Sequence, residues 1–201
     1  MKTTLALLCL VLFAACGSDD GDATAIEWGS VVPAPYLPAA TGPVHTDGLV
    51  TVMDTGTPEV CLGPVAESYP PQCSGPELLG WDWADHRQLF EHQGDVRWGQ
   101  FALTGTWDGE RLTVESAVPA ASYDAAPPPS LAVPVPAVKH STAELAEIAD
   151  DVASIPGAQG SGDVRGHNVV VSVVYDDGSL QDWADTTYGD GVVLVHSMLV
   201  S

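Results

Sequence analysis

Hydrophobic and polar positions follow two different periods along the chain. In the first half, the runs at 49–53, 96–106 and 111–115 alternate apolar with polar side chains or are rich in β-branched residues. Such runs predict β-strands. An Asp-Gly pair at 108–109 separates the last two runs and predicts a hairpin turn. The first half of the chain therefore predicts an antiparallel, β-rich module.

The second half begins with the signature of a helix. Ser141 and Glu144 match a capping box, in which each side chain can accept a hydrogen bond from the backbone amide of the other residue. Apolar residues then recur at helical spacing from 145 to 155, with acidic residues on the other side. Pro156 follows and ends the pattern. We expect an amphipathic helix that begins just after Ser141.

A strand, a helix and a second strand are predicted after this first helix. The run 169–175 is apolar at both parities, as is typical of a strand that is covered on both faces. Ser179 is expected to cap a short helix, and 192–200 is a second apolar strand. The connection between the two strands is long enough for a parallel crossover, so these elements predict a β-α-β unit.

Taken together, the patterns predict an α+β protein with two modules. Residues 44–119 are expected to form a small disulfide-linked antiparallel β-rich module, for which a partly closed OB-like barrel is one candidate form. Residues 138–201 are expected to form a small α/β module. The Ala/Pro-rich stretch 120–137 predicts a linker between them. Residues 16–43 are first Gly/Asp-rich and then Pro/Ala-rich, and predict a flexible tether.

Residues 1–15 have the layout of a signal peptide, with Lys2, an apolar run and small residues at the end. The apolar run is about half as long as a membrane span needs. The Ala-Ala-Cys sequence that ends at Cys16 resembles the lipobox of bacterial lipoproteins, although Phe13 stands where Leu, Val or Ile is usual. The resemblance implies that Cys16 is lipidated and anchors the protein to the cell membrane from outside the cytoplasm. Secretion without a lipid, after cleavage at Gly17, is the alternative.

The chain has four cysteines, and this interpretation of the N-terminus leaves two of them. Cys9 is lost with the signal peptide and Cys16 carries the lipid. Cys61 and Cys73 then form the expected disulfide in an oxidising compartment. A metal-binding or redox-active pair is the weaker alternative, because the spacing is not C-x-x-C and no histidine lies between the two.

The charge balance restricts the partners of the protein. Lys and Arg together number 6 against 27 Asp and Glu, which gives a formal net charge of −21. Loss of Lys2 with the signal peptide makes the chain one unit more negative. Such a surface repels nucleic acid and anionic head groups, so neither is an expected partner of the folded part. A cationic partner or a saline environment would both suit it.

One segment combines aromatic and acidic side chains. Trp81 and Trp83 are two residues apart and are expected on one side of a strand, with Asp82 and Asp85 close by. Aromatic rings beside carboxylates can bind a sugar or a cation, which makes these four residues the candidate ligand-binding site. The alternative is that the two tryptophans cover the disulfide.

No catalytic motif is found in the sequence. The patterns G-x-S-x-G, H-E-x-x-H, S-x-x-K and a phosphate-binding glycine loop are all missing from it. A short helix is expected from Ala84 to His92. It would carry His86 and His92, but they are six residues apart, which is the wrong spacing for two ligands on one helical face. The acidic residues between 176 and 190 do not follow the order of a calcium loop. We therefore predict no catalytic residue, no cofactor and no metal site.

Several segments resemble those of a group of uncharacterised exported lipoproteins from actinobacteria. The segments are Cys61-Leu62-Gly63-Pro64, Pro70 to Pro76, Gly80-Trp81-Asp82-Trp83, Gly105 to Gly109, Tyr175 to Gln181 and Tyr188 to Val193. The resemblance covers most of residues 44–200 and implies export, with no established activity. The predicted helix, valine-rich strand and C-terminal tail are also similar to the small pro-domains of secreted bacterial serine proteases.

These observations give one leading hypothesis and two alternatives. The leading hypothesis is a lipid-anchored, non-enzymatic envelope protein that binds a ligand or joins an assembly, with an envelope protein or a glycan as partner. The first alternative is a glycan-directed extracellular hydrolase, with Asp82 or Asp85 as its acid and base beside the tryptophans. The second alternative is that residues 138–201 act as an inhibitor or chaperone-like domain for another exported protein.

Overall fold

The structure is a computed structural model that describes residues 35–124, 133–160 and 162–201. The expected signal peptide and Cys16 lie outside the described residues, as does most of the expected tether. Within the described ranges, no helix combines the length and the apolar character that a membrane crossing requires. The described residues belong to one compact unit.

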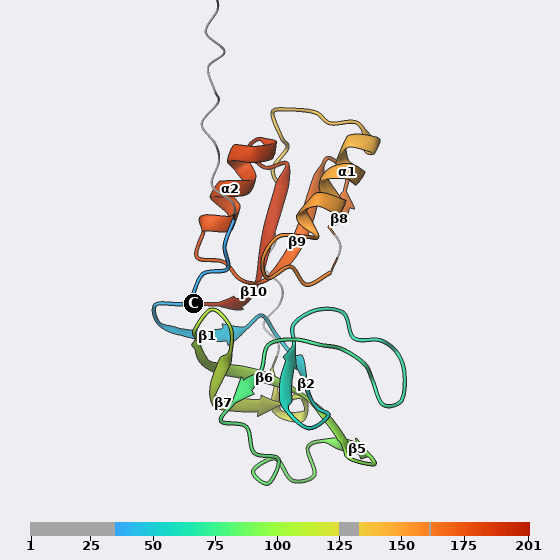
Figure 1. The fold of residues 1–201 in the computed structure, drawn as a ribbon, viewed down its shortest axis with the longest axis vertical. Coiled ribbons are helices and arrows are strands. Elements are labelled where there is room, and N and C mark those ends of the chain that lie inside the picture. The colour runs from blue at the N-terminus through green and yellow to red at the C-terminus, as the bar shows by residue number, and fades with distance from the viewer. Residues whose placement is uncertain (1–34, 125–132, 161) are drawn as a thin grey trace, which may run out of the picture. The chain divides into compact units, whose positions relative to one another are not determined.

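The described chain contains ten strands and three helical segments, whose colours run from blue to red in Figure 1. The strands are β1 (Pro43–Thr46), β2 (Val50–Asp54), β3 (Pro58–Cys61), β4 (Leu78–Leu79), β5 (Glu91–Gln93), β6 (Val96–Trp107), β7 (Leu112–Pro119), β8 (Asp163–Arg165), β9 (Asn168–Tyr175) and β10 (Val193–Val200). The helical segments are η1 (Ala120–Ser122), α1 (Thr142–Val152) and α2 (Ser179–Tyr188). The α+β class is confirmed.

The strands join in one mixed, curled sheet with the order β3-β2-β6-β1-β10-β9-β8. The long strand β6 pairs with β2 and β1 along one edge, and with β5 and β7 along the other. β4 pairs with β7, and a single bridge between Glu59 and Glu77 brings the chain before β4 next to β3. The first strands therefore curl into a half-barrel.

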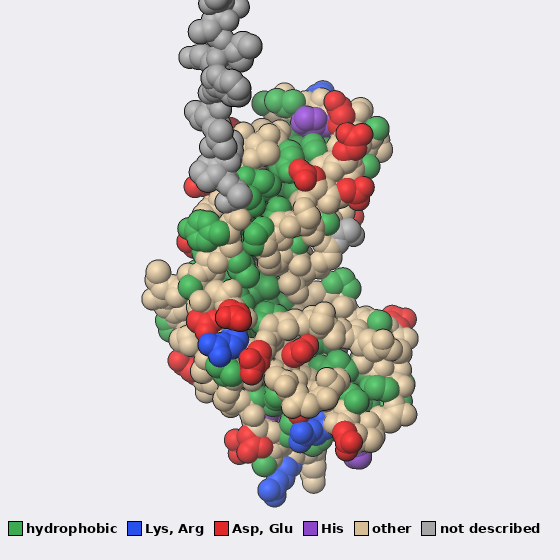
Figure 2. All heavy atoms as spheres, in the orientation of Figure 1, with side chains coloured by type: hydrophobic (Ala, Val, Ile, Leu, Met, Phe, Trp, Pro, Cys, Tyr) green, Lys and Arg blue, Asp and Glu red, His purple; other side chains and the backbone are tan. Residues whose placement is uncertain are grey.

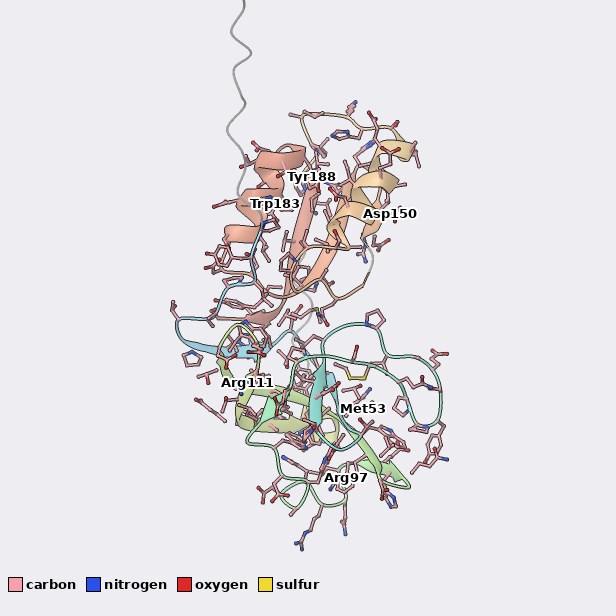
Figure 3. The ribbon with its side chains drawn as sticks, in the orientation of Figure 1. Met53, Arg97, Arg111, Asp150, Trp183 and Tyr188 are labelled. Carbon is pink, nitrogen blue, oxygen red and sulfur yellow. A yellow bond between two sulfur atoms is a disulfide. The ribbon has the colours of Figure 1, made fainter. Side chains whose placement is uncertain are left out.

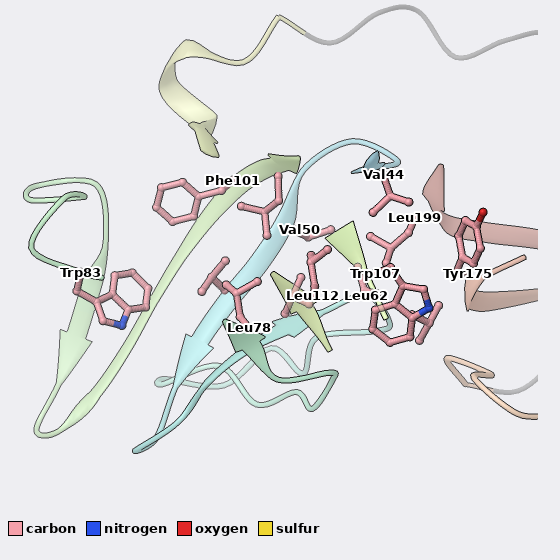
Figure 4. Close-up of a cluster of buried hydrophobic side chains, with 14 residues drawn as sticks. Val44, Val50, Leu62, Leu78, Trp83, Phe101, Trp107, Leu112, Tyr175 and Leu199 are labelled. Atoms are coloured by element: carbon pink, nitrogen blue, oxygen red, sulfur yellow. The ribbon is translucent and has the colours of Figure 1, made fainter. Parts of the chain in front are cut away.

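The interior of the half-barrel is the first hydrophobic core, called here the barrel core (Figure 4). Alternate residues of β6 point into it, among them Phe101 and Leu103, while Gln100, just before Phe101, is exposed. This is the alternation that the sequence predicts for the strand. The hairpin at Asp108-Gly109 is also confirmed: Gly109 has φ +97°, a conformation that glycine adopts without steric cost.

A second core lies between the helices and the C-terminal strands. Val169, Val171 and Val173 of β9 pack there with Leu145 of α1 and Leu180 of α2. Both helices therefore cover the same face of the sheet, in agreement with Figure 1. β9 and β10 pair in parallel across the α2 connection, so the predicted β-α-β unit is confirmed.

The two expected modules share this sheet. β1 pairs with β6 on one side and with β10 on the other, so a strand of the first module connects to the second. Tyr175 and Leu199, from β9 and β10, pack in the barrel core. The division into two modules at residues 120–137 stays a prediction. The pairing of β1 with β10 connects the two expected modules through backbone hydrogen bonds.

The N-terminal end of the described chain also packs on the barrel. Leu37 and Ala40 contact the barrel core, and the indole of Trp107 donates a hydrogen bond of 2.9 Å to the carbonyl oxygen of Pro38. Tyr36 is exposed. Part of the segment that was expected to be a tether is therefore fixed against the fold.

The predicted disulfide between Cys61 and Cys73 is present, with the two Cα atoms 5.9 Å apart (Figure 3). It closes the segment 62–72, which we call the disulfide loop. Inside this loop the amide of Ala66 donates to the carbonyl oxygen of Gln72, at 2.8 Å. The loop is therefore fixed by a covalent bond at its base and by a backbone hydrogen bond within it.

The two predicted helix caps have different outcomes. Ser141 and Glu144 form the predicted capping box of α1. The cap predicted at Ser179 is wrong, because Ser179 is already helical and the N-cap is Gly178, with φ +100°. The carboxylate of Asp176 instead caps the start of the helix, because it accepts hydrogen bonds from the amides of Gly178, Leu180 and Gln181. An aspartate two residues before the glycine can reach over the turn, whereas the Ser179 side chain starts inside it.

Candidate functional site

The four residues of the candidate ligand-binding site lie together, in a turn rather than on a strand. The predicted strand at Trp81–Trp83 is therefore wrong, and so is the short helix expected from Ala84 to His92, which consists of turns followed by β5. The chain turns at this point because the amides of Asp85 and His86 donate to the carbonyl oxygens of Asp82 and Trp83. The side chain of Asp82 also accepts from the amide of Ala84, at 2.8 Å.

The tryptophans of this turn belong to the barrel core. Trp83 is only 4% exposed, and Trp81 is half-buried against Phe101, with ring centroids 4.9 Å apart. The ring of His86 stacks on Trp81 at 4.1 Å. Asp82 and Asp85 are exposed. The segment therefore presents its two carboxylates to solvent but almost no ring surface of Trp83, which limits any ligand contact to the other three residues.

A buried carboxylate explains why Trp83 points inward. Asp54, at the end of β2, is 3% exposed and accepts a hydrogen bond of 2.9 Å from the indole nitrogen of Trp83. The guanidinium of Arg97 donates to the same oxygen at 2.7 Å, and the amide of Gly56 donates to the other oxygen at 2.8 Å. A buried charge is tolerated where it is paired and hydrogen-bonded in this way. The sequence reasoning missed this residue, because the Asp-Thr-Gly segment predicts only a turn.

A large hollow lies elsewhere, on the outer face of the half-barrel. It has a volume of about 920 Å³ and is open to solvent along one side. We call it the groove. Its floor is formed by Thr51 of β2 with Trp98 and Gln100 of β6, one wall by the disulfide loop, and the other wall by the turn at residues 88–91. Its volume lies within the range of protein ligand-binding sites.

The groove exposes apolar side chains from separate parts of the chain. Leu49, Val65, Tyr69 and Leu89 line it and are all exposed, with Tyr69 the most at 66%. Isolated exposed hydrophobic residues need no explanation, but a contiguous set around a hollow indicates an interaction site. Tyr69 stands edge-on to Trp98, with ring centroids 5.2 Å apart, so the disulfide loop is anchored on the groove floor.

The charged side chains that line the groove are all acidic. Glu67 in the disulfide loop and Glu91 at the start of β5 line it, and the described lining includes no lysine, arginine or histidine. Acidic side chains are also spread over the face of the molecule that Figure 2 shows, with a few lysines and arginines between them. A ligand of the groove would therefore meet apolar surface and negative potential together.

The turn that forms one wall of the groove contains an uncommon backbone conformation. Gln88 has φ +68°, the left-handed region that side chains other than glycine rarely adopt. Such residues often occur at binding sites, where the surrounding structure holds them in place. The neighbouring Gly99 of β6 makes room for this turn, because a Cβ atom there would lie 2.9 Å from the carbonyl oxygen of Leu89.

Several acidic residues of the C-terminal half have structural partners. Asp176 caps α2, and the side chain of Asp185 accepts from the amide of Gly191 at 2.9 Å. Asp151 of α1 accepts from the hydroxyl of Tyr188, and burial of this hydroxyl with the hydrogen bond raises the pKa of Tyr188. Tyr188 packs edge-on to Trp183 (Figure 3). These contacts tie α2 to α1 and to the loop before β10.

Two further histidines, His196 and His167, lie at the surface of the C-terminal half. His196 of β10 lies 2.7 Å from the carboxylate of Asp47, with both side chains about half exposed, and His167 is exposed. In the ranges that the structure describes, no group of three His, Cys, Asp or Glu side chains is placed to hold a metal ion.

Comparisons of the chain with protein-family models, with curated proteins and with solved structures gave no match. The resemblance to exported actinobacterial lipoproteins therefore stays a prediction. The sequence analysis did not identify the groove, although one signal for it is present. The segment Glu67 to Pro71 places an aromatic residue next to two prolines inside a disulfide-closed loop. Proline prevents such a residue from joining a regular strand or helix, so its ring is more easily left at the surface.

Proposed function

We propose that this protein is a non-enzymatic binding protein that acts outside the cytoplasm, with the groove as its ligand-binding site. The observation that carries the proposal is the groove itself, in which four exposed apolar side chains surround a fixed floor. A binding site of this kind needs no movement to form, because a disulfide closes the base of one of its walls. Preformed sites lose less free energy on binding, since their side chains and loops are already ordered.

The location outside the cytoplasm is supported by the disulfide, since such bonds persist mainly in oxidising compartments. We propose further that Cys16, which lies outside the described residues, carries a lipid that anchors the chain to the membrane. In this arrangement the half-barrel would be an OB-like module and residues 138–201 a second module. The proposal assigns the groove to the first of them.

The anchoring is tested by labelling cells with a fatty-acid analogue. The full-length protein should incorporate the label and fractionate with membranes, and Cys16→Ser should do neither. Label-free protein in the culture fluid would contradict the anchor. Cleavage after Gly17 would then be the better explanation.

Binding at the groove is tested by a photoreactive amino acid placed at one position at a time in the native cell. Position 89 lies in the groove wall, and Val164 in β8 is a matched control, because its side chain is similarly exposed and lies outside the groove. We expect a discrete cross-linked product from position 89 and none from position 164. The product should decrease when Tyr69→Ala is added. Equal cross-linking at both positions, or none at position 89, would contradict a binding role for the groove.

No contact among the described residues supports either of the two alternative functions. A glycan hydrolase at Asp82 and Asp85 needs two carboxylates that face each other across a cleft, and both side chains are exposed on one turn that lines no described hollow. The inhibitor role of residues 138–201 rests on the resemblance to pro-domains alone. Both stay predictions.

A further inference from the structure

The walls and floor of the groove favour an extended ligand. β5 pairs with β6 up to Trp98, and β7 pairs with it from Phe101 onward, so in the described chain neither strand pairs with Gly99 or Gln100 along that edge. The groove lies across this gap and continues between the disulfide loop and the 88–91 turn. A compact ligand would use only part of this surface, whereas an extended chain would follow it.

The chemistry of the lining restricts the ligand further. The exposed apolar side chains of Leu49, Val65 and Leu89 offer hydrophobic contacts, and the two carboxylates of Glu67 and Glu91 are not paired with a basic residue in any described contact. A ligand with apolar side chains and positive charges complements both features. The net charge of the chain, −21, would attract such a ligand over a longer range.

On the basis of the proposed binding function, we infer that the groove takes an extended, basic segment of another polypeptide. Alternate side chains of such a segment point in opposite directions. Its apolar side chains would contact the groove wall around Leu89, while lysines or arginines would lie near Glu67 and Glu91. We assign this ligand class because the lining of the groove combines exposed apolar side chains with two carboxylates.

Other classes of ligand fit the groove less well. A glycan is bound through flat exposed ring faces, but Trp98 is only 7% exposed and Tyr69 stands edge-on to it, which leaves Tyr69 as the one strongly exposed ring of the described lining. Anionic lipid surfaces and nucleic acids are repelled by carboxylates. A basic polypeptide is the class that both the shape and the charge favour.

The inference is tested with the full mature chain and three probes. The first is a synthetic decapeptide that alternates lysine with leucine or valine and has a central proline to keep it extended. The second replaces each lysine by glutamate, and the third is a neutral oligosaccharide. Binding is followed by the backbone amide NMR signals of Ser68, Gln88 and Gln100. We expect saturable shifts of these signals with the lysine peptide only. Its affinity should fall as salt rises from about 0.01 M to about 0.1 M, because screening shortens from about 30 Å to about 10 Å.

A charge variant locates the contact. Glu67→Gln with Glu91→Gln should weaken binding of the lysine peptide by about three- to tenfold at low salt, since each exposed pair contributes modestly. The matched control is Glu147→Gln with Asp150→Asn on the exposed face of α1, which removes the same charge away from the groove and should leave the affinity unchanged. All four side chains are exposed, so both variants should fold.

Each other outcome has a definite meaning. Equal binding of the lysine and glutamate peptides, or equal weakening by both charge variants, would overturn the inference. Shifts caused by the oligosaccharide alone would overturn it too, while leaving the groove as a binding site. If no probe shifts the groove signals but position 89 cross-links in cells, only the ligand class is wrong. If both experiments fail, the proposed function fails with it.

Discussion

Two aromatic regions of the half-barrel have opposite roles. The turn at 81–85 combines tryptophans with acids and looks like a binding site in the sequence, but Trp83 is 4% exposed and hydrogen-bonded to Asp54. The disulfide loop looks purely structural, but Tyr69 is 66% exposed and lines the groove. Aromatic residues near acids therefore do not by themselves indicate a binding site, because a buried carboxylate can hold an indole in the core.

The two regions should differ most in stability when each aromatic ring is removed in turn. Trp83→Ala should lower the free energy of unfolding by about 3–5 kcal/mol, because it leaves a cavity in the barrel core and removes a donor from Asp54. Tyr69→Ala should cost less than about 1 kcal/mol, because the ring is mostly in solvent. Urea denaturation followed by circular dichroism measures both.

A third variant separates the two effects at Trp83. Trp83→Phe keeps an aromatic ring in the core but removes the indole donor, and should cost about 1–3 kcal/mol for the hydrogen bond to a buried carboxylate. If Tyr69→Ala destabilised the protein as much as Trp83→Ala, the two regions would not differ in the way proposed.

Removing the disulfide should loosen the disulfide loop more than the turn at 81–85. Cys61→Ser with Cys73→Ser should lower the free energy of unfolding by about 3 kcal/mol, because the unfolded chain gains the freedom that the closed loop denies it. In the variant that remains folded, amide exchange should increase in the disulfide loop but not around Trp83. Unchanged exchange in the loop would show that the groove wall does not depend on the disulfide.

A region in which sequence and structure agree provides the reference for these changes. Ser141→Ala, which removes the cap of α1, should cost about 1 kcal/mol and leave the groove unchanged. The backbone amide of Ser141 hydrogen-bonds the carboxylate of Glu144 and holds the pKa of this group below its usual 4.5. The stabilisation is therefore complete above this value and is lost as the pH falls through the lowered pKa.

The pH dependence is measured by comparing the wild-type protein with Glu144→Gln, which is matched in size. The difference in the free energy of unfolding should be present at neutral pH and should disappear in acid. A difference that stays constant across this range would mean that ionisation of Glu144 does not contribute to the capping box.

Local patterns in the sequence predicted most of the regular elements. The alternation in 96–106 and the box at Ser141 and Glu144 depend only on residues close in the chain, and the structure confirms both. The pairing of Cys61 with Cys73 followed from the number of cysteines, since these two are left once Cys9 and Cys16 are assigned to the signal peptide and the lipid. Two of the failures, at Trp81–Trp83 and at Ser179, have another physical origin. Asp54 lies 29 residues before Trp83 and Asp176 lies three positions before Ser179, and no periodicity marks either partner.

The groove could not be predicted from the sequence for the same reason. Its floor, walls and exposed apolar side chains come from β2, β6, the disulfide loop and the 88–91 turn, which are brought together only by the curling of the sheet. The pairing of β1 with β10 is likewise set by contacts across the whole chain. Sequence patterns of this length predict elements, but they do not predict which surfaces those elements leave open.

The smallest expected effect concerns the strained turn beside the groove. Gln88→Gly should raise the free energy of unfolding by up to about 1 kcal/mol, because glycine adopts φ +68° without the cost of about 1–2 kcal/mol that a side chain brings, and loses part of this gain to its greater freedom when unfolded. Gln88→Ala is the control, since it removes the side chain but keeps the strain, and should not stabilise. A stabilised glycine variant whose 88–91 turn exchanges amide protons faster than before would show that the side chain of Gln88, and not its backbone conformation alone, keeps this wall of the groove in place.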